Sequence, residues 1–422
     1  MGSGKEGGTM SRRSTPLQWM LGILLVLMLW PGLAWAQSKN LRVVFMEYDP
    51  KANPYYLGLG TDFEKQNPGT KVEVEIIPWA QGRDRLVVWI SGGQAPDLAL
   101  VGTRWLYEFA DMNAVEPLDR FASKDFLKDF YPAVLQGGYY QGHLYGLPVA
   151  VSTKSLYYRT DLFEKAGLQP PKTWDELLEA ARKLHGSEAY GIGIAGSKHW
   201  QTLDNWTMFF YTAGGRYFDD AGKCALNGAA GVKSLQFFVD LANRYKVTQP
   251  GPVAHNRSDI QNMFAAGKLA MVWTGPWFFG ILDRDQPNLK YAVARTPKGT
   301  VNSTQVMTDS MLVFNQSKNK DLAWKFLEFM YQDQRRLGFD KAMGMLPEKQ
   351  TVAKDATFQS DKRWRQFLEE LDGAVIFPSN GVWAKISDVL VVAIQEALVA
   401  GRPAQQALDD ACRKVDEITG KR

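Results

Sequence analysis

The chain has few of the residues from which catalytic and metal centres are usually built. Its 422 residues include 2 Cys and 4 His, and the histidines (His143, His185, His199 and His255) have no metal-ligand spacing. Neither Gly-x-Ser-x-Gly nor His-Glu-x-x-His occurs, and the glycines at 191 and 193 do not fit a phosphate-binding loop. These absences favour a non-enzymatic protein without cofactor or metal. Two carboxylates brought together for glycoside cleavage would leave no motif, so that alternative stays open.

The chain also lacks a strong charge of either sign. The formal net charge is +4, and no basic run is dense enough to bind nucleic acid. Internal repeats and low-complexity linkers are absent as well. The length is sufficient for two sizeable hydrophobic cores.

The first 36 residues have the pattern of an export signal. Arg12 and Arg13 precede an apolar run at 19–30 that is too short to span a bilayer, and Ala34-Trp35-Ala36 gives a small-x-small cleavage site. Retention of this segment as an anchor is the alternative. Export would place the protein in an oxidising compartment, where Cys224 and Cys412 are able to pair, but their spacing alone does not decide it.

Strand and helix patterns alternate in the first half. Strands are expected at 41–45, 71–77 and 97–101, with helices at 56–66 and 81–91 between them. This order predicts an α/β fold with a mostly parallel sheet. Ligands bind beyond the carboxyl ends of such strands, so the segments 46–54, 78–83 and 102–105 are expected to share one rim.

The second half has the same style without repeating the sequence. A strand is expected at 189–195, and Thr173 is expected to cap the helix at 174–185. Helices are expected at 174–185, 232–245, 258–267, 321–331, 389–399 and 404–418.

Tryptophan is unusually frequent, with 14 residues, many of them beside Gly or Pro. A tryptophan ring has a large apolar face and one polar N–H. That combination suits a sugar, whose C–H faces are apolar and whose rim carries hydroxyls. The composition therefore favours a carbohydrate ligand.

Eight segments in order resemble the extracellular solute-binding proteins of sugar ABC importers, a family that includes maltose-binding protein. One is Gly-Gly-Gln-Ala-Pro-Asp-Leu at 92–98. The others lie at 144–148, 156–163, 170–176, 212–215, 264–278, 317–327 and 344–347. Each is weak alone, but together they extend over nearly the whole chain after residue 36.

The resemblance implies a periplasmic-binding-protein-like fold of two α/β lobes, with a hinge and a ligand cleft between them. One lobe would comprise 37–148 plus 297–344, and the other 149–296 plus 345–422. The chain would cross near Pro148, 295–297 and 344–347. The implied protein is a periplasmic monomer that binds a di- or oligosaccharide and delivers it to membrane permease subunits.

The resemblance also assigns candidate ligand contacts. Trp277 and Trp383 stand where the family places aromatic platforms, and Glu47 and Tyr48 follow the first strand, where polar contacts are frequent. Candidates from the sequence alone are the tryptophans beside polar or rim segments, namely Trp79, Trp105 and Trp200. The alternative for each tryptophan is core packing, and for Glu47 it is a solvated loop. Trp273, inside an apolar run, is expected in the core.

Four positions depart from the family pattern. Arg104 stands where maltose-binding protein has an acid, and the segment that carries a second acid there has Ser152 and Lys154 here. Asp309 replaces the small residue of many relatives. Cations in place of acids suggest a second class of ligand, an anionic sugar acid or a phosphorylated polyol such as glycerol phosphate. The family topology also implies that Cys224 and Cys412 pair if the last helix returns to the second lobe.

Overall fold

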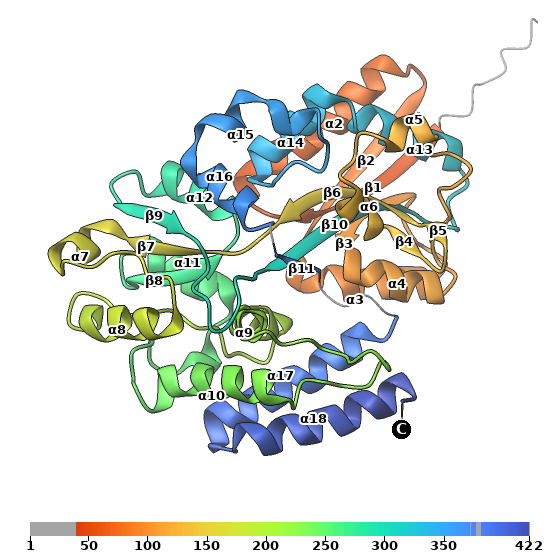
Figure 1. Ribbon diagram of the computed structural model, residues 1–422. Helices are drawn as coiled ribbons and strands as arrows, with labels where there is room; N and C mark the ends of the chain where they lie inside the picture. The colour runs from red at the N-terminus through yellow and green to blue at the C-terminus, as the bar shows by residue number, and fades with distance from the viewer. Residues whose placement is uncertain (1–38, 372, 377–380, 422) are drawn as a thin grey trace, which may run out of the picture.

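The computed structural model describes residues 39–371, 373–376 and 381–421, and the signal peptide predicted for 1–36 lies outside them. The described chain forms two α/β lobes (Figure 1), one around β1, β2 and β3 and the other around β7, β8 and β9. We call them the first and the second lobe. Among the described helices, none has the length and apolar character needed to cross a bilayer.

A six-stranded sheet forms the centre of the first lobe, in the order β11-β10-β3-β1-β2, with β6 also paired to β10. Its strands are β1 (Lys39–Glu47), β2 (Thr70–Pro78), β3 (Leu98–Gly102), β6 (Gly146–Ser152), β10 (Gln305–Val313) and β11 (Val375–Ile376). As predicted, β1 is parallel to β2 and β3, whereas β10 is antiparallel to β3 and β6. The carboxyl ends of the three parallel strands therefore meet at one edge.

Helices cover both faces of this sheet because its central strands are apolar. Every residue of β3 is buried, so both faces of the sheet are covered there. Phe63 packs edge-on against Phe326 and Phe329 on the covering helices. The helices are η1 (Pro50–Ala52), α2 (Asn53–Gln66), α3 (Trp79–Ser91), α4 (Thr103–Asp111), α5 (Lys124–Leu127), α6 (Pro132–Gln136), α13 (Lys320–Met330) and α14 (Asp333–Met343), with a small hairpin of β4 (Tyr139–Tyr140) and β5 (His143–Leu144).

The second lobe contains a three-stranded sheet in the order β8-β7-β9 and a bundle of helices beneath it (Figure 1). Helix α9 lies inside that bundle, because every residue from Gln201 to Thr212 is buried. The elements are β7 (Ser155–Arg159), β8 (Met271–Thr274), β9 (Tyr291–Ala294), α7 (Thr160–Lys165), α8 (Trp174–Leu184), α9 (Trp200–Thr212), α10 (Ala229–Asn243), η2 (Pro252–Ala254), α11 (Arg257–Ala265), α12 (Trp277–Asp285), η3 (Val352–Lys354), α15 (Ala356–Ser360), α16 (Lys362–Glu369), α17 (Trp383–Ala400) and α18 (Ala404–Thr419).

The chain passes between the two sheets after β6 and before β10, and a third passage leads from α14 to the second-lobe helices η3, α15 and α16. It then returns to the first sheet at β11 before entering α17. The first two passages are bonded to each other, since the hydroxyls of Thr296 and Thr304 both donate to the backbone carbonyl of Lys154, at 3.0 and 2.9 Å. The lobe boundaries at 148, 296 and 344 remain predictions.

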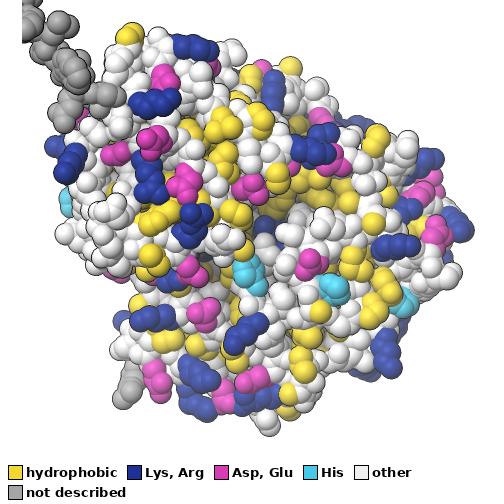
Figure 2. Space-filling view, turned by 180° about the vertical axis from the view of Figure 1, so that it is seen from behind, with side chains coloured by type: hydrophobic (Ala, Val, Ile, Leu, Met, Phe, Trp, Pro, Cys, Tyr) yellow, Lys and Arg dark blue, Asp and Glu magenta, His cyan; other side chains and the backbone are white. Residues whose placement is uncertain are grey.

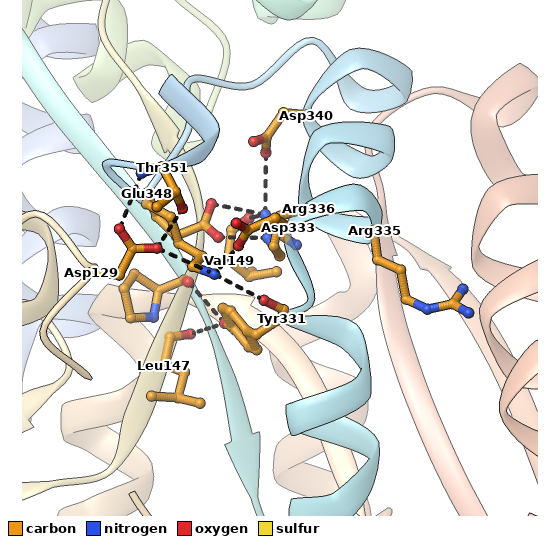
Figure 3. A network of polar contacts seen from close by, with 12 residues as sticks. Asp129, Leu147, Val149, Tyr331, Asp333, Arg335, Arg336, Asp340, Glu348 and Thr351 are labelled. Atoms are coloured by element: carbon orange, nitrogen blue, oxygen red, sulfur yellow. Dashed lines mark hydrogen bonds and ion pairs between the residues drawn. The ribbon is translucent and has the colours of Figure 1, made fainter. Parts of the chain in front are cut away.

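The first and third passages are joined by a buried polar network (Figure 3). The Arg336 guanidinium is fully buried and donates to both carboxylate oxygens of Glu348, to Asp340, and to the backbone carbonyl of Val149 on β6. The Tyr331 hydroxyl donates to two further carbonyls of the same strand. The network thus fixes the segment after α14 against β6.

Most expected elements are present. The strands at 41–45, 71–77 and 97–101 and the helices between them are confirmed, and the Thr173 hydroxyl caps α8 through the Glu176 amide at 3.2 Å. The strand expected at 189–195 is wrong, because it forms only isolated bridges. The Gln249 side chain bonds the N–H and C=O of Ile194 and takes the place of a neighbouring strand.

Cys224 and Cys412 form a disulfide, which connects the loop before α10 to α18. This outcome agrees with the family topology, because α18 packs in the second-lobe core.

We expect Cys224→Ser/Cys412→Ser to lower the free energy of unfolding by about 2–5 kcal/mol, because the bond closes a long loop of the unfolded chain. Urea unfolding of the oxidised protein and of the variant measures the difference. Two titratable thiols in the unreduced, denatured protein would show that the bond does not form.

Candidate ligand-binding site

A cavity of about 60 Å³ lies at the edge where the carboxyl ends of β1, β2 and β3 meet. Figure 2 shows hydrophobic side chains gathered in a hollow between the two halves of one face of the molecule. The residues that line the cavity come from both lobes and from the passages: Tyr48, Trp79, Arg104, Ser152, Trp200, Arg257, Trp277, Met307, Asp309 and Met345.

Five helices present residues of their first turn to this cavity. Trp79, Trp200, Arg257 and Trp277 are the first residues of α3, α9, α11 and α12, and Arg104 is the second residue of α4. Local sequence sets these starts: Asn256, for example, forms a capping box ahead of Arg257. Because helix N-termini carry partial positive charge, the cavity favours oxygen-rich or negatively charged groups.

A second cavity of about 210 Å³ adjoins the first and shares Trp79, Arg104, Trp200 and Met307 with it. It extends between α3 and α4 of the first lobe and α9 and α17 of the second. The two cavities together form an elongated space between the lobes.

Indole and phenol rings make up much of the first cavity's wall. Trp79 lies between Tyr48 and Trp105, with ring centroids 5.5 Å from each. Trp277 packs against the first-lobe core as well as against the helices of the second lobe. Its ring folds back over Gly275, where a Cβ would come within 2.0 Å of it. The ring is therefore confined on one side by backbone.

Three cations contact these rings. The Arg104 guanidinium carbon lies 4.4 Å from the Trp200 ring centre, and Arg257 lies 5.1 Å from that of Trp277. The Lys154 ammonium lies 4.4 Å from the Trp277 centre, with its side chain only 2% exposed. Indole faces attract cations, most strongly where water is excluded.

Two carboxylates balance part of this charge. The Tyr48 hydroxyl donates to Asp309, whereas Asp204 lies 3.5 Å from the Lys154 ammonium and 3.3 Å from Arg257. Burial raises the pKa of Asp309 to about 6 and lowers that of Lys154 to about 8. The cations outnumber the acids, so the surroundings of the cavity are positive when all five groups are charged.

Seven predicted site residues line the first cavity: Tyr48, Trp79, Arg104, Ser152, Trp200, Trp277 and Asp309. Trp105 and Trp383 line only the second cavity and are 6% and 3% exposed. Trp383 is mainly a core residue, because α17 starts six residues earlier than predicted and its ring packs against Tyr217. Trp273 is in the core, as predicted.

Two predicted contacts need correction. Glu47 lines neither cavity, since its carboxylate accepts a hydrogen bond of 2.8 Å from Asn53 at the start of α2. Lys154 also lines neither cavity, and its ammonium contacts the Trp277 ring and the Asp204 carboxylate of the second lobe.

Sequence reasoning missed Arg257, Met307, Met345 and the supporting Asp204. The helix expected at 258–267 begins one residue earlier, which brings Arg257 into its first turn. Met345 belongs to a segment that the family resemblance places at a crossing, and that signal was sufficient to find it. Nothing in the sequence around Asp204 marks it out from an ordinary helical acid.

The lobes also touch beside the cavity. Asp49, next to Tyr48, pairs with Arg284 at 2.5 Å, and Lys51 pairs with Asp285 at 2.5 Å. Water and salt screen such pairs near the surface, so they contribute little to stability. The described residues contain no group of three His, Cys, Asp or Glu side chains placed to hold a metal ion.

Comparison with known proteins identifies relatives over the whole length of the fold. The family model for bacterial extracellular solute-binding proteins matches residues 49–335. A binding protein of Brucella abortus (strain 2308) is 33% identical over 409 residues, 96% of this chain and 99% of the relative. The maltotriose-binding protein of Pyrococcus abyssi is 25% identical over 369 residues, 82% of this chain and 76% of the relative.

A solved structure is also similar. An ABC transporter solute-binding protein from Thermotoga lettingae, bound to α-D-tagatose, has a TM-score of 0.85 at 29% identity, over 90% of this chain and 100% of that one. This similarity confirms the expected fold class of two α/β lobes.

We expect Trp277→Ala to weaken ligand binding by about tenfold to a thousandfold, because it removes both the stacked ring and its buried area. Trp206, which is fully buried in the second-lobe core, provides the control. Trp206→Ala is expected to cost about 3–5 kcal/mol of stability, more than Trp277→Ala. A large fall in melting temperature with unchanged affinity would assign Trp277 to the core.

The lowered pKa of Lys154 predicts how the stability of the protein depends on pH. Its folded pKa of about 8 lies below the 10.5 of an unperturbed lysine, so between these values the unfolded chain binds the extra proton. The free energy of unfolding should therefore rise with pH over that window, relative to Lys154→Met. Denaturant unfolding of both proteins at several pH values tests this. A difference that does not change with pH would show that the ammonium is not disfavoured in the folded state.

Proposed function

Because the chain belongs to the bacterial extracellular solute-binding proteins, we propose that it is the substrate-binding protein of an ABC importer for a carbohydrate. It captures its ligand in the space between the lobes as a monomer outside the cytoplasm, and delivers it to the membrane permease. The observation that carries the proposal is the convergence of three tryptophans and Tyr48 on one cavity that also holds hydrogen-bonding side chains.

The wall of the cavity suits the two surfaces of a sugar. The indole faces of Trp79, Trp200 and Trp277 offer stacking surfaces for C–H groups, while Arg104 donates to hydroxyl oxygens and Asp309 accepts from hydroxyls. Stacking contributes on the order of 1 kcal/mol beyond the burial of apolar area. The tagatose complex of the Thermotoga lettingae relative supports this class of ligand.

The volumes favour a short ligand. The first cavity accepts part of one sugar ring, and the contiguous second cavity offers more room towards α17. We propose one or two sugar units, with one ring against Trp277 and the remainder beside Trp105 and Trp383.

The contacts of Asp309 and Asp204 are compatible with binding without turnover. Asp309 accepts from Tyr48, and Asp204 lies behind the wall between two cations. A glycosidase requires two carboxyl groups placed on either side of the same glycosidic bond. Solute-binding proteins of this family are not enzymes, and the proposed role is capture alone.

One observation favours an anionic sugar acid or phosphorylated polyol as the second candidate. Arg104 lines the cavity, and its buried Nη2 has no hydrogen-bond partner among the described residues. Buried cations without such partners are costly, and a ligand carboxylate or phosphate is able to complete the Arg104 fork with two parallel bonds.

A thermal-shift screen over monosaccharides, disaccharides, oligosaccharides, polyols, sugar acids and sugar phosphates tests the main proposal. A carbohydrate that binds the folded protein should raise its melting temperature by mass action. At a ligand concentration one hundred times Kd, the free energy of unfolding should increase by about 2.7 kcal/mol. Titration calorimetry should give one site, with the sugar recovered unchanged. Stabilisation by amino acids alone, with every carbohydrate inactive, would contradict the proposal.

The second candidate is tested by comparing a hexose with its uronic acid at low and high salt. If the ligand is anionic, the acid should bind more tightly, lose affinity as salt increases, and depend on Arg104. The neutral hexose provides the control, because stacking and neutral hydrogen bonds respond little to salt. An acid affinity that is independent of salt and survives Arg104→Gln would exclude the anionic ligand.

A further inference from the structure

Asp204 lines neither cavity, yet it contacts two of the cations that surround the first one. It lies on α9, and its side chain is 3% exposed. Its Oδ2 atom is 3.3 Å from Arg257 and 3.5 Å from Lys154, while its Oδ1 atom is buried without a hydrogen-bond partner among the described residues. One carboxylate therefore serves two cations.

Both cations that contact Asp204 also contact the Trp277 ring. Arg257 lies 5.1 Å and Lys154 4.4 Å from the centre of the Trp277 ring. Arg257 also lies 5.6 Å from the Trp200 ring, and it is the only one of the two cations that lines the cavity. The direction of its guanidinium depends on the bond to Asp204, because its Nε has no partner among the described residues.

The backbone of Lys154 is fixed independently. Its carbonyl accepts from Thr296 and Thr304, so the side chain extends from the point where two passages between the lobes meet. The ion pair with Asp204 thus connects this junction to α9, and Arg257 connects α9 to α11. Trp277, the first residue of α12, lies against both cations.

We infer that Asp204 is a positioning residue for the ligand site: through Arg257 and Lys154 it holds the Trp277 ring and the cavity-facing guanidinium in the orientation that binds the ligand. The inference concerns the same site as the proposed function and rests on it for the identity of the ligand. The arrangement selects ligands that offer an apolar face to Trp277 and an oxygen acceptor to Arg257 at the same time.

Asp204→Asn tests the inference with little change in shape. Asp161→Asn is the control, because Asp161 on α7 also pairs with a largely buried arginine, Arg159, and neither residue lines a cavity. Protein labelled with 5-fluorotryptophan gives a ¹⁹F signal for Trp277, assigned through Trp277→Phe. We expect Asp204→Asn to shift or broaden this signal, and Asp161→Asn to leave it in place.

This first readout needs no ligand, so its result is separate from that of the proposed function. A Trp277 signal that is unchanged in Asp204→Asn overturns the inference. If Asp204→Asn does not fold, Lys154→Met/Asp204→Asn leaves one buried cation instead of two and is measured against Lys154→Met.

The second readout is the affinity for D-tagatose in a double-mutant cycle with Arg257→Gln. Asp204→Asn should weaken binding about tenfold in the native background and clearly less once Arg257 is replaced, because only its contact with Lys154 then remains. Equal losses in both backgrounds would show that Asp204 does not act through Arg257. If D-tagatose does not bind the native protein, the fluorine signal alone decides, and the choice of sugar in the proposed function is what has failed.

Discussion

The buried Arg336 guanidinium joins the first and third passages between the lobes, and the form of the ligand site depends on that junction. It bonds to β6 through the Val149 carbonyl and to the segment after α14 through Glu348. Ser152 and Met345 line the cavity; Ser152 lies three residues after Val149, and Met345 three residues before Glu348. Leu346 pairs with Val151 between them. The first-lobe wall of the cavity is therefore held by a network whose side chains do not line the cavity.

On the second-lobe side of the cavity, the cations Lys154 and Arg257 lie against the Trp277 ring. Removing a lysine and an arginine from water costs several kcal/mol for each ion, more than the roughly 2 kcal/mol that a desolvated cation–π contact returns. Asp204 offsets part of that cost, and the remainder is consistent with the lowered pKa of Lys154. Such an arrangement is poor for stability alone. It is compatible with the proposed role of binding an oxygen-rich ligand.

Sequence alone predicted the features that follow from local pattern. The period-two and apolar runs located β1, β2 and β3, and the rule for parallel strands placed Tyr48, Trp79 and Arg104 on one rim. Trp277 came from family resemblance. The misses depend on contacts between segments distant in sequence: Lys154 does not line the cavity, and its ammonium contacts Asp204, fifty residues later. Trp383 is buried because α17 extends further than its periodicity suggested.

The most direct test is a crystal structure of the protein with the carbohydrate that gives the largest rise in melting temperature. One sugar ring should lie against Trp277, with hydroxyl or acid oxygens at Arg104 and Arg257, and the rest of the ligand should extend towards Trp383. A carbohydrate bound elsewhere on the surface, with the space between the lobes filled by water, would contradict this account.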